Sequence, residues 1–417
     1  MTKLSRRSFL AATGLGTAAA VTGVGTAFVA AAPGEPTGDR LVLIFLAGGA
    51  DGLTMTPPYG YSSYRDLRPN LGVPDPGAAG GALELTTASS GGNAVFPTGI
   101  EGVVGLHPSF KPLHDTVWKQ GQLAVLPMMG LPGLSRSHFS AQKNFHYGGK
   151  SNARAGGWLG RAIDAKAIGG RYTSVHDPEA GRPIAGSTQT AGIINALGDF
   201  AVTGFDDNTK AATALDSLYE GGDSVSAEGR KVLGGIRDIA SLDTRLRPGY
   251  SRRRTGRALS EIATMFEAFP EIRVASMQLG GWDHHSNLGR GGDPNGKFAQ
   301  MTAELTEGLM GFINDTKLDG VTVMVITEFG RTINENSSGG TDHGRAGTFM
   351  VMGQGIRGGV YGDDYPDVLT LGGRDRADSP ILTDFRKAAT DVVGNRFQVD
   401  PQVAFPDYSG GGLGITR

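Results

Sequence analysis

The chain has 417 residues, with 39 lysines and arginines against 41 aspartates and glutamates. This near balance of charge argues against nucleic acid or an anionic membrane surface as a partner. The sequence contains no cysteine, which excludes disulfides, thiolate metal sites and a cysteine nucleophile.

The N-terminal segment has the features of an export signal. Arg6-Arg7 is followed by Phe9-Leu10 and by an apolar stretch that ends in Ala30-Ala31-Ala32. This order is typical of the twin-arginine export route, so we predict that residues 1–32 are a signal peptide. The stretch is long enough to span a bilayer, and an uncleaved anchor is therefore the alternative. Its mild hydropathy and small-residue end favour cleavage, which leaves no stable membrane anchor and a protein in the periplasm, the cell envelope or the medium.

The mature chain, residues 33–417, fits a single large α/β domain. Apolar runs predict strands at 40–47, 122–128, 272–279, 321–327 and 348–352. Because these runs do not alternate with polar residues, we expect strands buried on both faces. Spacing of apolar residues and boundary signals predict helices at 108–118, 137–147, 226–243, 257–269 and 298–312. The alternation of strands and helices predicts a three-layer α/β/α fold with a mostly parallel sheet.

The segment at about 160–256 is the least regular part of the sequence. We predict that it is an insertion or cap on the domain rather than a separate domain. It ends in a basic stretch, residues 245–257, that contains six arginines. These arginines could contact an anionic substrate, although a solvated surface is the commoner role of such a stretch.

Several polar residues follow the predicted strands directly. Asp51, Asp283 and Glu328 each come just after such a strand, and Ser137 follows the loop after another. Because parallel strands end at one edge of a sheet, we expect these side chains to meet there, where open α/β sheets bind ligands. With His285, Asp342 and His343 added, they form a set of carboxylates and imidazoles suited to Zn²⁺, Mn²⁺ or Mg²⁺.

Ser137 follows a glycine-rich loop and begins a predicted helix. A helix N-cap is the structural interpretation of such a serine. The functional interpretation is a nucleophile activated by an adjacent metal, with the substrate anion near the start of the helix. Arg136 or Arg331 could hold the anionic group, and His138 is a further candidate for a ligand or general acid. We expect the remaining histidines His107, His114, His146 and His176 to be structural.

Six motifs occur in order along the mature chain. They are Leu106-His107-Pro108, Ser137-His138-Phe139, Gly157-Trp158-Leu159-Gly160-Arg161, Gly281-Trp282-Asp283 with His285, Thr327-Glu328-Phe329-Gly330-Arg331-Thr332 and Gly340-Thr341-Asp342-His343-Gly344. Together they resemble the bacterial exported family known as domain of unknown function 1501. His284 stands where threonine is usual in that family, which makes His285 the expected ligand of the two.

The family in turn resembles, more distantly, the alkaline phosphatase and sulfatase superfamily. That resemblance implies a metal-ligand role for Asp51, the nucleophile's role for Ser137, and ligand roles for Asp283 with His285 and for His343. Phe329 stands where the superfamily has a histidine, and phenylalanine cannot bind metal. One metal instead of two, or a site that has lost catalysis, therefore both stay open.

The resemblance implies an exported, metal-dependent hydrolase of small phosphate or sulfate esters that acts through Ser137. The alternative is a non-catalytic exported binding or assembly protein on the same fold, because a fold alone does not determine activity.

Replacement of Arg6 and Arg7 by lysines is expected to block export, because the transport pathway recognises the arginine pair as an address. Fractionation of cells that express each form would measure this. Normal amounts of shortened protein outside the cytoplasm in the Arg6→Lys, Arg7→Lys double variant would contradict the assignment of the route.

Overall fold

The computed structural model describes residues 39–97, 99–133, 135–149, 156–165, 241–270, 272–363 and 377–417, together with residues 21–22 and short stretches between 172 and 238. The predicted signal peptide, apart from residues 21–22, lies outside the described residues, as do His176 and much of the predicted insertion at about 160–256. None of the described helices is long and apolar enough to cross a bilayer.

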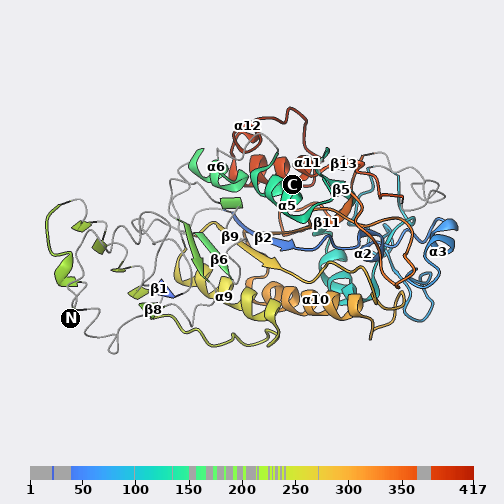
Figure 1. The fold of residues 1–417 in the computed structure, drawn as a ribbon, viewed down its shortest axis with the longest axis horizontal. Coiled ribbons are helices and arrows are strands. Elements are labelled where there is room, and N and C mark those ends of the chain that lie inside the picture. Colours follow the sequence, from blue (N-terminus) through green and yellow to red (C-terminus); the bar gives the residue numbers. More distant parts are fainter. Residues whose placement is uncertain are drawn as a thin grey trace.

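A nine-stranded sheet forms the centre of the described part of the chain (Figure 1). Its strands, in spatial order, are β12 (Gly359–Val360), β5 (Leu123–Gly130), β11 (Gly347–Met352), β10 (Val321–Ile326), β2 (Arg40–Leu46), β9 (Val274–Leu279), β6 (Tyr172–Val175) and β7 (Ala191–Ile194), with β13 (Thr383–Asp384) also beside β5. The five strands from β10 to β7 are parallel, whereas β11 is antiparallel to both β10 and β5. The sheet is therefore mostly parallel, as predicted.

Helices cover both faces of this sheet (Figure 1). One face carries α9 (Arg254–Ala268) and α10 (Lys297–Thr316), and the other carries α5 (His138–Tyr147), α6 (Trp158–Ala165), α11 (Phe385–Asp391) and α12 (Pro401–Ala404). The central strand β2 shows why two helical layers are needed. Val42, Ile44 and Leu46 pack into the core beneath α9 and α10, while the alternate residues Leu41, Leu43 and Phe45 pack into the core of the opposite layer. Side chains on both faces of a strand bury apolar surface only if each face is covered, so the three-layer α/β/α prediction is confirmed.

The predicted strands at 40–47, 122–128, 272–279, 321–327 and 348–352 correspond to β2, β5, β9, β10 and β11. The predicted helices at 137–147, 257–269 and 298–312 correspond to α5, α9 and α10. Gly148 ends α5 in the left-handed conformation, at φ 71°, which is the usual role of a glycine after a helix. The predicted helix at 108–118 is instead three short turns: a 3-10 turn (Pro108–Phe110), α4 (Lys111–Leu113) and a π turn (His114–Trp118).

The remaining described elements are short. They are α2 (Gly52–Met55), α3 (Ser63–Leu67), the antiparallel pair of β3 (Leu83–Glu84) and β4 (Gly105–Leu106), the pair of β1 (Val21–Thr22) and β8 (Ala201–Val202), and a π turn (Val392–Arg396) after α11. Within the predicted insertion, β6 and β7 extend the main sheet beside β9. Its role as a cap stays a prediction.

One edge of the sheet collects residues from distant parts of the chain. The parallel strands β2, β9 and β10 end there, as does β5, and the antiparallel β11 begins there. The segments that follow β2, β5, β9 and β10, and the segment that precedes β11, therefore lie at a common edge. These segments carry Asp51, Ser137, Asp283, Glu328 and His343.

Candidate metal site

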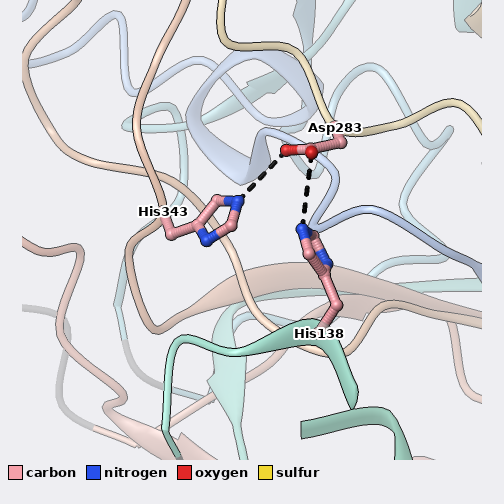
Figure 2. Close-up of side chains that lie close together, drawn as sticks. All are labelled: His138, Asp283 and His343. Carbon is pink, nitrogen blue, oxygen red and sulfur yellow. Dashed lines mark hydrogen bonds and ion pairs between the residues drawn. The ribbon is translucent and has the colours of Figure 1, made fainter. Parts of the chain in front are cut away.

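Among the described residues, His138, Asp283 and His343 form a group with the composition of a metal site (Figure 2). One ligand atom from each lies within 4.8 Å of the other two. His138 is the first residue of α5, Asp283 follows β9, and His343 precedes β11. Two imidazoles and a carboxylate from three elements are a typical ligand set for a zinc-like ion that keeps an open coordination position.

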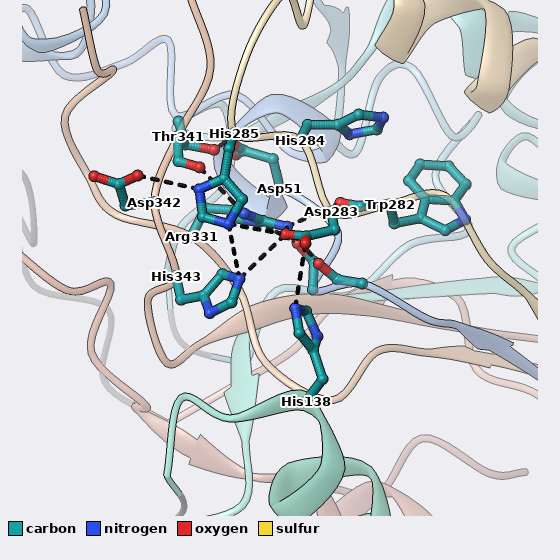
Figure 3. Close-up of polar contacts among 12 residues, drawn as sticks. Asp51, His138, Trp282, Asp283, His284, His285, Arg331, Thr341, Asp342 and His343 are labelled. Atoms are coloured by element: carbon teal, nitrogen blue, oxygen red, sulfur yellow. Dashed lines mark hydrogen bonds and ion pairs between the residues drawn. The ribbon is translucent and has the colours of Figure 1, made fainter. Parts of the chain in front are cut away.

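After β9, buried and exposed side chains alternate along the chain. Trp282 and His284 are buried, whereas Asp283 and His285 are exposed. Figure 3 shows Asp283 and His285 turned toward His343, and His284 turned away from Asp283. This alternation places His285, and not His284, on the side of the site.

A carboxylate fixes the orientation of the His138 ring. Its Nδ1 lies 2.8 Å from Glu328 Oε1, which also accepts hydrogen bonds from the Gly48 amide at 2.9 Å and from Gln142 at 3.0 Å. Because an ionised carboxylate only accepts, Nδ1 carries the hydrogen in the neutral ring, and Nε2 then keeps its lone pair. Nε2 lies 3.4 Å from Asp283 Oδ2, is buried, and has no hydrogen-bond partner. A buried lone pair of this kind is what a metal ligand presents.

The other two rings at the site are held in the same manner. His343 Nδ1 lies 2.9 Å from the Arg136 carbonyl oxygen, and His285 Nδ1 lies 3.1 Å from Asp342 Oδ1. Each Nε2 therefore points into the site, and each lies 3.1 Å from Asp283 Oδ1. The two Nε2 atoms are 3.0 Å apart (Figure 3). Two lone pairs at this distance repel each other unless a proton or a cation lies with them, so the arrangement is suited to a bound cation.

Arg331 supplies a positive charge beside these side chains. Its side chain is fully buried, and Nη2 lies 2.6 Å from Asp283 Oδ1. The other contacts of the guanidinium are with backbone carbonyls: Gly49 at 2.6 Å, Thr341 at 3.1 Å, Trp282 at 3.1 Å, and Gly48. Arg331 is one of two predicted candidates, with Arg136, for the residue that holds the anionic group of a substrate. In the structure its donors are directed at the protein, and it positions Asp283.

Electrostatics at the site favour an ionised Asp283 and shift the pKa values of the His138 and His343 rings in opposite directions. Burial alone would raise the pKa of Asp283, but the Arg331 guanidinium and the neighbouring imidazoles outweigh it and bring the pKa to about 2. Burial lowers the pKa of His343. The pKa of His138 is raised, first by its hydrogen bond to Glu328, with burial opposing.

Glu328 and Phe329 lie beside the grouped residues His138, Asp283 and His343. Glu328 is buried and its Oε1 is occupied by three donors, while Oε2 accepts from Thr327 at 3.2 Å. The Phe329 ring lies 4.8 Å, centroid to centroid, from both His138 and His343. The pair thus provides a hydrogen-bond acceptor for one imidazole and an apolar wall for two.

Asp51 lies in a buried ion pair apart from the three-residue group. Arg68 Nη1 and the Thr54 amide donate to Oδ1 at 2.8 and 3.0 Å, and the Thr341 hydroxyl donates to Oδ2 at 2.9 Å. Burial would raise the pKa of Asp51, but Arg68 and these hydrogen bonds together lower it. Both carboxylate oxygens of Asp51 therefore accept hydrogen bonds from Arg68, Thr54 and Thr341. These partners differ from those of Asp283, which lies beside imidazoles and Arg331.

Ser137 lies between two residues that contact the site. The Arg136 carbonyl accepts from His343, and His138 faces Asp283. Ser137 is exposed, and its side chain makes no capping hydrogen bond to α5, although its backbone has the extended conformation of an N-cap. The Arg136 side chain pairs with Asp378 at 2.8 Å on the rim, where Arg345 pairs with the same carboxylate at 3.0 Å. Asp342 is the partner of His285 in this arrangement, through its Oδ1.

The remaining described histidines lie elsewhere. His107 is buried and accepts a hydrogen bond from the Ser109 amide, and burial lowers its pKa to about 4. His114 lies 2.8 Å from the Glu84 carbonyl, and His146 packs against Phe45. His284 contacts Met301 and the Phe298 ring, and burial lowers its pKa to about 4.

Sequence analysis did not identify Arg68 or Gln142. Arg68 lies in an irregular segment rich in proline and glycine, where nothing in the local pattern predicts a buried cation. Gln142 lies one helical turn after His138, at the spacing that places two side chains on one helix face. The spacing of four residues therefore indicates from the sequence that Gln142 lies beside His138.

Comparison with known proteins identifies a family without a described activity. The model described as "Protein of unknown function (DUF1501)" matches residues 38–376, in agreement with the resemblance read from the motifs. No curated protein matches the chain.

Among solved structures, the chain is similar to the C-terminal periplasmic domain of EcEptC from Escherichia coli in complex with Zn, with 8% identity, a TM-score of 0.34, and coverage of 78% of this chain and 77% of that one. Alkaline phosphatase from the Antarctic bacterium TAB5 matches with 9% identity, a TM-score of 0.30, and coverage of 78% and 95%. The lipoteichoic acid synthase LtaP from Listeria monocytogenes matches with 12% identity, a TM-score of 0.33, and coverage of 86% and 78%. Similarity this distant carries no conclusion about activity.

Asp51→Asn is expected to lower the free energy of unfolding by about 3–5 kcal/mol, because it leaves the buried Arg68 charge without its counterion. The metal content per folded chain should stay unchanged, since Asp51 is not one of the grouped ligands. The lowered pKa of Asp51 means that its contribution is present above the unfolded-state pKa of about 4 and is lost as pH falls through the folded-state pKa.

Chemical denaturation at several pH values, with elemental analysis of the folded protein, measures both effects. Asp115→Asn is the matched control, because Asp115 forms exposed pairs with Lys111 and Lys119 that contribute at most about 1 kcal/mol. Loss of metal from Asp51→Asn with unchanged stability would instead make Asp51 a ligand.

Proposed function

Since this chain belongs to the DUF1501 family, whose description assigns no function, we propose from the chemistry of its site that it is an exported, metal-dependent hydrolase of phosphate or sulfate esters. The observation that carries the proposal is the convergence of three imidazole Nε2 atoms on the Asp283 carboxylate, each ring oriented through Nδ1 by an oxygen acceptor. Export rests on the Arg6-Arg7 signal and remains part of the proposal.

His138, Asp283 and His343 would hold the metal, and His285 is positioned to complete the set. Imidazole-rich ligation with one carboxylate suits Zn²⁺ best among the predicted ions, with Mn²⁺ and Mg²⁺ as the alternatives. A divalent ion held there would supply Lewis-acid activation of an ester for hydrolysis. Glu328, the Arg136 carbonyl and Asp342 would keep the three rings oriented, as partners of metal-bound histidines do.

Ser137 is the proposed nucleophile because it is exposed between two residues that contact the site and its hydroxyl is not used as a helix cap. Its oxygen would bond to the phosphorus or sulfur atom as the bond to the ester oxygen breaks. The hydroxyl proton passes to solvent, and the departing ester oxygen takes a proton from solvent to leave as an alcohol. Water then cleaves the serine ester and regenerates the hydroxyl.

The substrate anion would lie where the first amides of α5 and the Arg136 side chain can reach it. The helix is 10 residues long, and its first turn points at the site through His138. Helix N-termini favour anions because their amides lack partners within the helix. Arg136 is half-exposed and paired with Asp378, so it can exchange that partner for a substrate.

Asp283→Ala, His343→Ala and His285→Ala are expected to remove or strongly weaken bound metal, because each deletes a group that points into the site. Glu328→Gln should lower metal affinity by about 10–100-fold, since it changes the hydrogen-bond acceptor of His138. Elemental analysis and metal titration of purified protein measure these effects.

His284→Ala is the matched control for His285→Ala, since the two residues are adjacent and only His285 faces the site. His284→Ala should keep its metal and lose stability through loss of core packing. Wild-type protein that binds no divalent ion under metal-replete conditions would overturn the proposal.

Ser137→Ala is expected to abolish ester cleavage while the protein keeps its metal, because loss of a nucleophile costs many orders of magnitude in rate. Its stability should change little, since the serine makes no capping bond. A true N-cap would cost about 0.5–2 kcal/mol. Turnover and denaturation are measured on the same preparation.

Intact turnover in Ser137→Ala would exclude this serine from the mechanism. If metal-loaded wild-type protein cleaves no phosphate or sulfate ester, the non-catalytic binding or assembly role becomes the better assignment.

A further inference from the structure

Phe139 is the one large apolar side chain among the described residues that is almost fully exposed. It is 87% exposed, whereas the next such residue, Val403 on α12, is 38% exposed. The other phenylalanine of α5, Phe145, is buried and packs against Phe349 and Phe385. Burial of an aromatic ring is among the larger favourable contributions that one side chain makes to folding. Phe139 makes no such contribution, so the fold does not account for a phenylalanine at this position.

The position of Phe139 makes its exposure informative, because single exposed apolar side chains are otherwise common on protein surfaces. Phe139 is the second residue of α5, next to His138 and two residues after Ser137. Consecutive Cα atoms are about 3.8 Å apart, so the Cα atoms of Ser137 and Phe139 are separated by at most about 7.6 Å. The Phe139 ring can therefore reach an ester that is bound at Ser137.

The first turn of α5 divides its side chains between the site and the solvent. Ser137 and Phe139 are exposed, whereas His138 between them is half-buried and turned toward Asp283 (Figure 2). The first hydrogen bond of the helix runs from the Ala141 amide to the Ser137 carbonyl at 2.9 Å, so the amides before Ala141, including that of Phe139, have no partner within the helix. An ester whose anion lies at Ser137 and these amides has its organic part on the exposed side, where the Phe139 ring lies.

We propose that Phe139 is a specificity-determining residue: its ring contacts the alcohol part of the ester, so the protein prefers esters of aromatic alcohols to esters of small aliphatic alcohols. The proposal rests on the hydrolase function proposed above and narrows its substrate class. The contact removes apolar surface of both partners from water, and two aromatic rings gain further from an offset or edge-to-face arrangement. It involves the organic part of the substrate, and it therefore holds for phosphate and sulfate esters alike.

The first experiment measures binding, so that its result does not depend on turnover. Mature, metal-loaded Ser137→Ala protein is titrated calorimetrically with phenyl and methyl phosphate, and with phenyl and methyl sulfate. Both members of a pair carry the same anionic group, so the ratio of their Kd values reports the contact with the organic group. We expect the phenyl ester to bind at least about 10-fold more tightly than the methyl ester in at least one pair. Equal affinities within both pairs, or no binding of any of the four esters, would overturn the inference.

Phe139→Ala, made in the same Ser137→Ala protein, should lower the preference for the phenyl ester by about 10-fold, and Phe139→Trp should retain it. Both variants should fold, because the ring is exposed. Val403→Ala is the matched control, since it shortens the other exposed large apolar side chain, and it should leave the preference unchanged. Arg136→Ala should weaken binding of both members of a pair to the same extent, because this residue would contact the anion. An unchanged preference in Phe139→Ala, or an equal fall in Val403→Ala, would contradict the role of Phe139.

Failure of this inference can be told apart from failure of the proposed function. If wild-type protein cleaves an ester but Phe139→Ala does not change the preference, the hydrolase function stands and the inference fails. If wild-type protein cleaves no ester but the preference depends on Phe139, the hydrolase function fails and the inference about binding stands. Sedimentation of wild-type and Phe139→Ala protein tests a different occupant. A dimer that Phe139→Ala dissociates would show that a second copy of the chain covers the ring, and this would overturn the inference.

Discussion

The carboxylate of Asp283 is the group around which the edge of the sheet is organised. A single oxygen, Oδ1, lies within 3.1 Å of one guanidinium nitrogen and two imidazole nitrogens. Arg331 and His343 belong to the segment between β10 and β11, and His285 lies two residues after Asp283 in the same segment. Its second oxygen faces His138 on α5. A negative charge is stable here only because cationic or polar groups from different elements surround it. The same group therefore ties the strand ends together and leaves a polar site open to solvent.

Close backbone packing makes this arrangement sterically feasible. Gly48 adopts a φ of 126°, and a Cβ atom at this position would lie 2.4 Å from the Asp283 amide nitrogen. At Gly330 a Cβ would lie 1.6 Å from the Ala346 carbonyl oxygen. Any larger residue at either position would force the strand ends apart, and the carbonyls that hold Arg331 come from this same region. Gly48 and Gly330 thus allow the close backbone packing in which carbonyl groups accept the hydrogen bonds of the buried Arg331.

The sequence was most informative where a local pattern directly reports burial. Continuous apolar runs identified β2, β9 and β10, and because their ends share an edge, the convergence of Asp283 and His343 could be predicted. The preference for His285 over His284 came from the family resemblance, and the side-chain alternation gives its physical reason. The roles of Arg331, Glu328 and Asp51 could not be read from spacing, because each depends on which atoms of other segments lie beside it. The direction of β11 could not be predicted either, because an apolar run does not show whether its strand is parallel or antiparallel to its neighbours. The helices at the C-terminus were not predicted either.

The reversed direction of β11 has a consequence for how the site is built. Because β10 and β11 are antiparallel neighbours, the chain between them folds back on itself, and the backbones of Arg331 and His343 form an antiparallel bridge. The fixed cation and one of the imidazoles therefore belong to a single hairpin with a shared register. An insertion or deletion within this hairpin would displace both at once, whereas His138 on α5 and Asp283 after β9 lie outside it. The length of this hairpin is therefore a geometric constraint on the site in its own right, in addition to the identity of its residues.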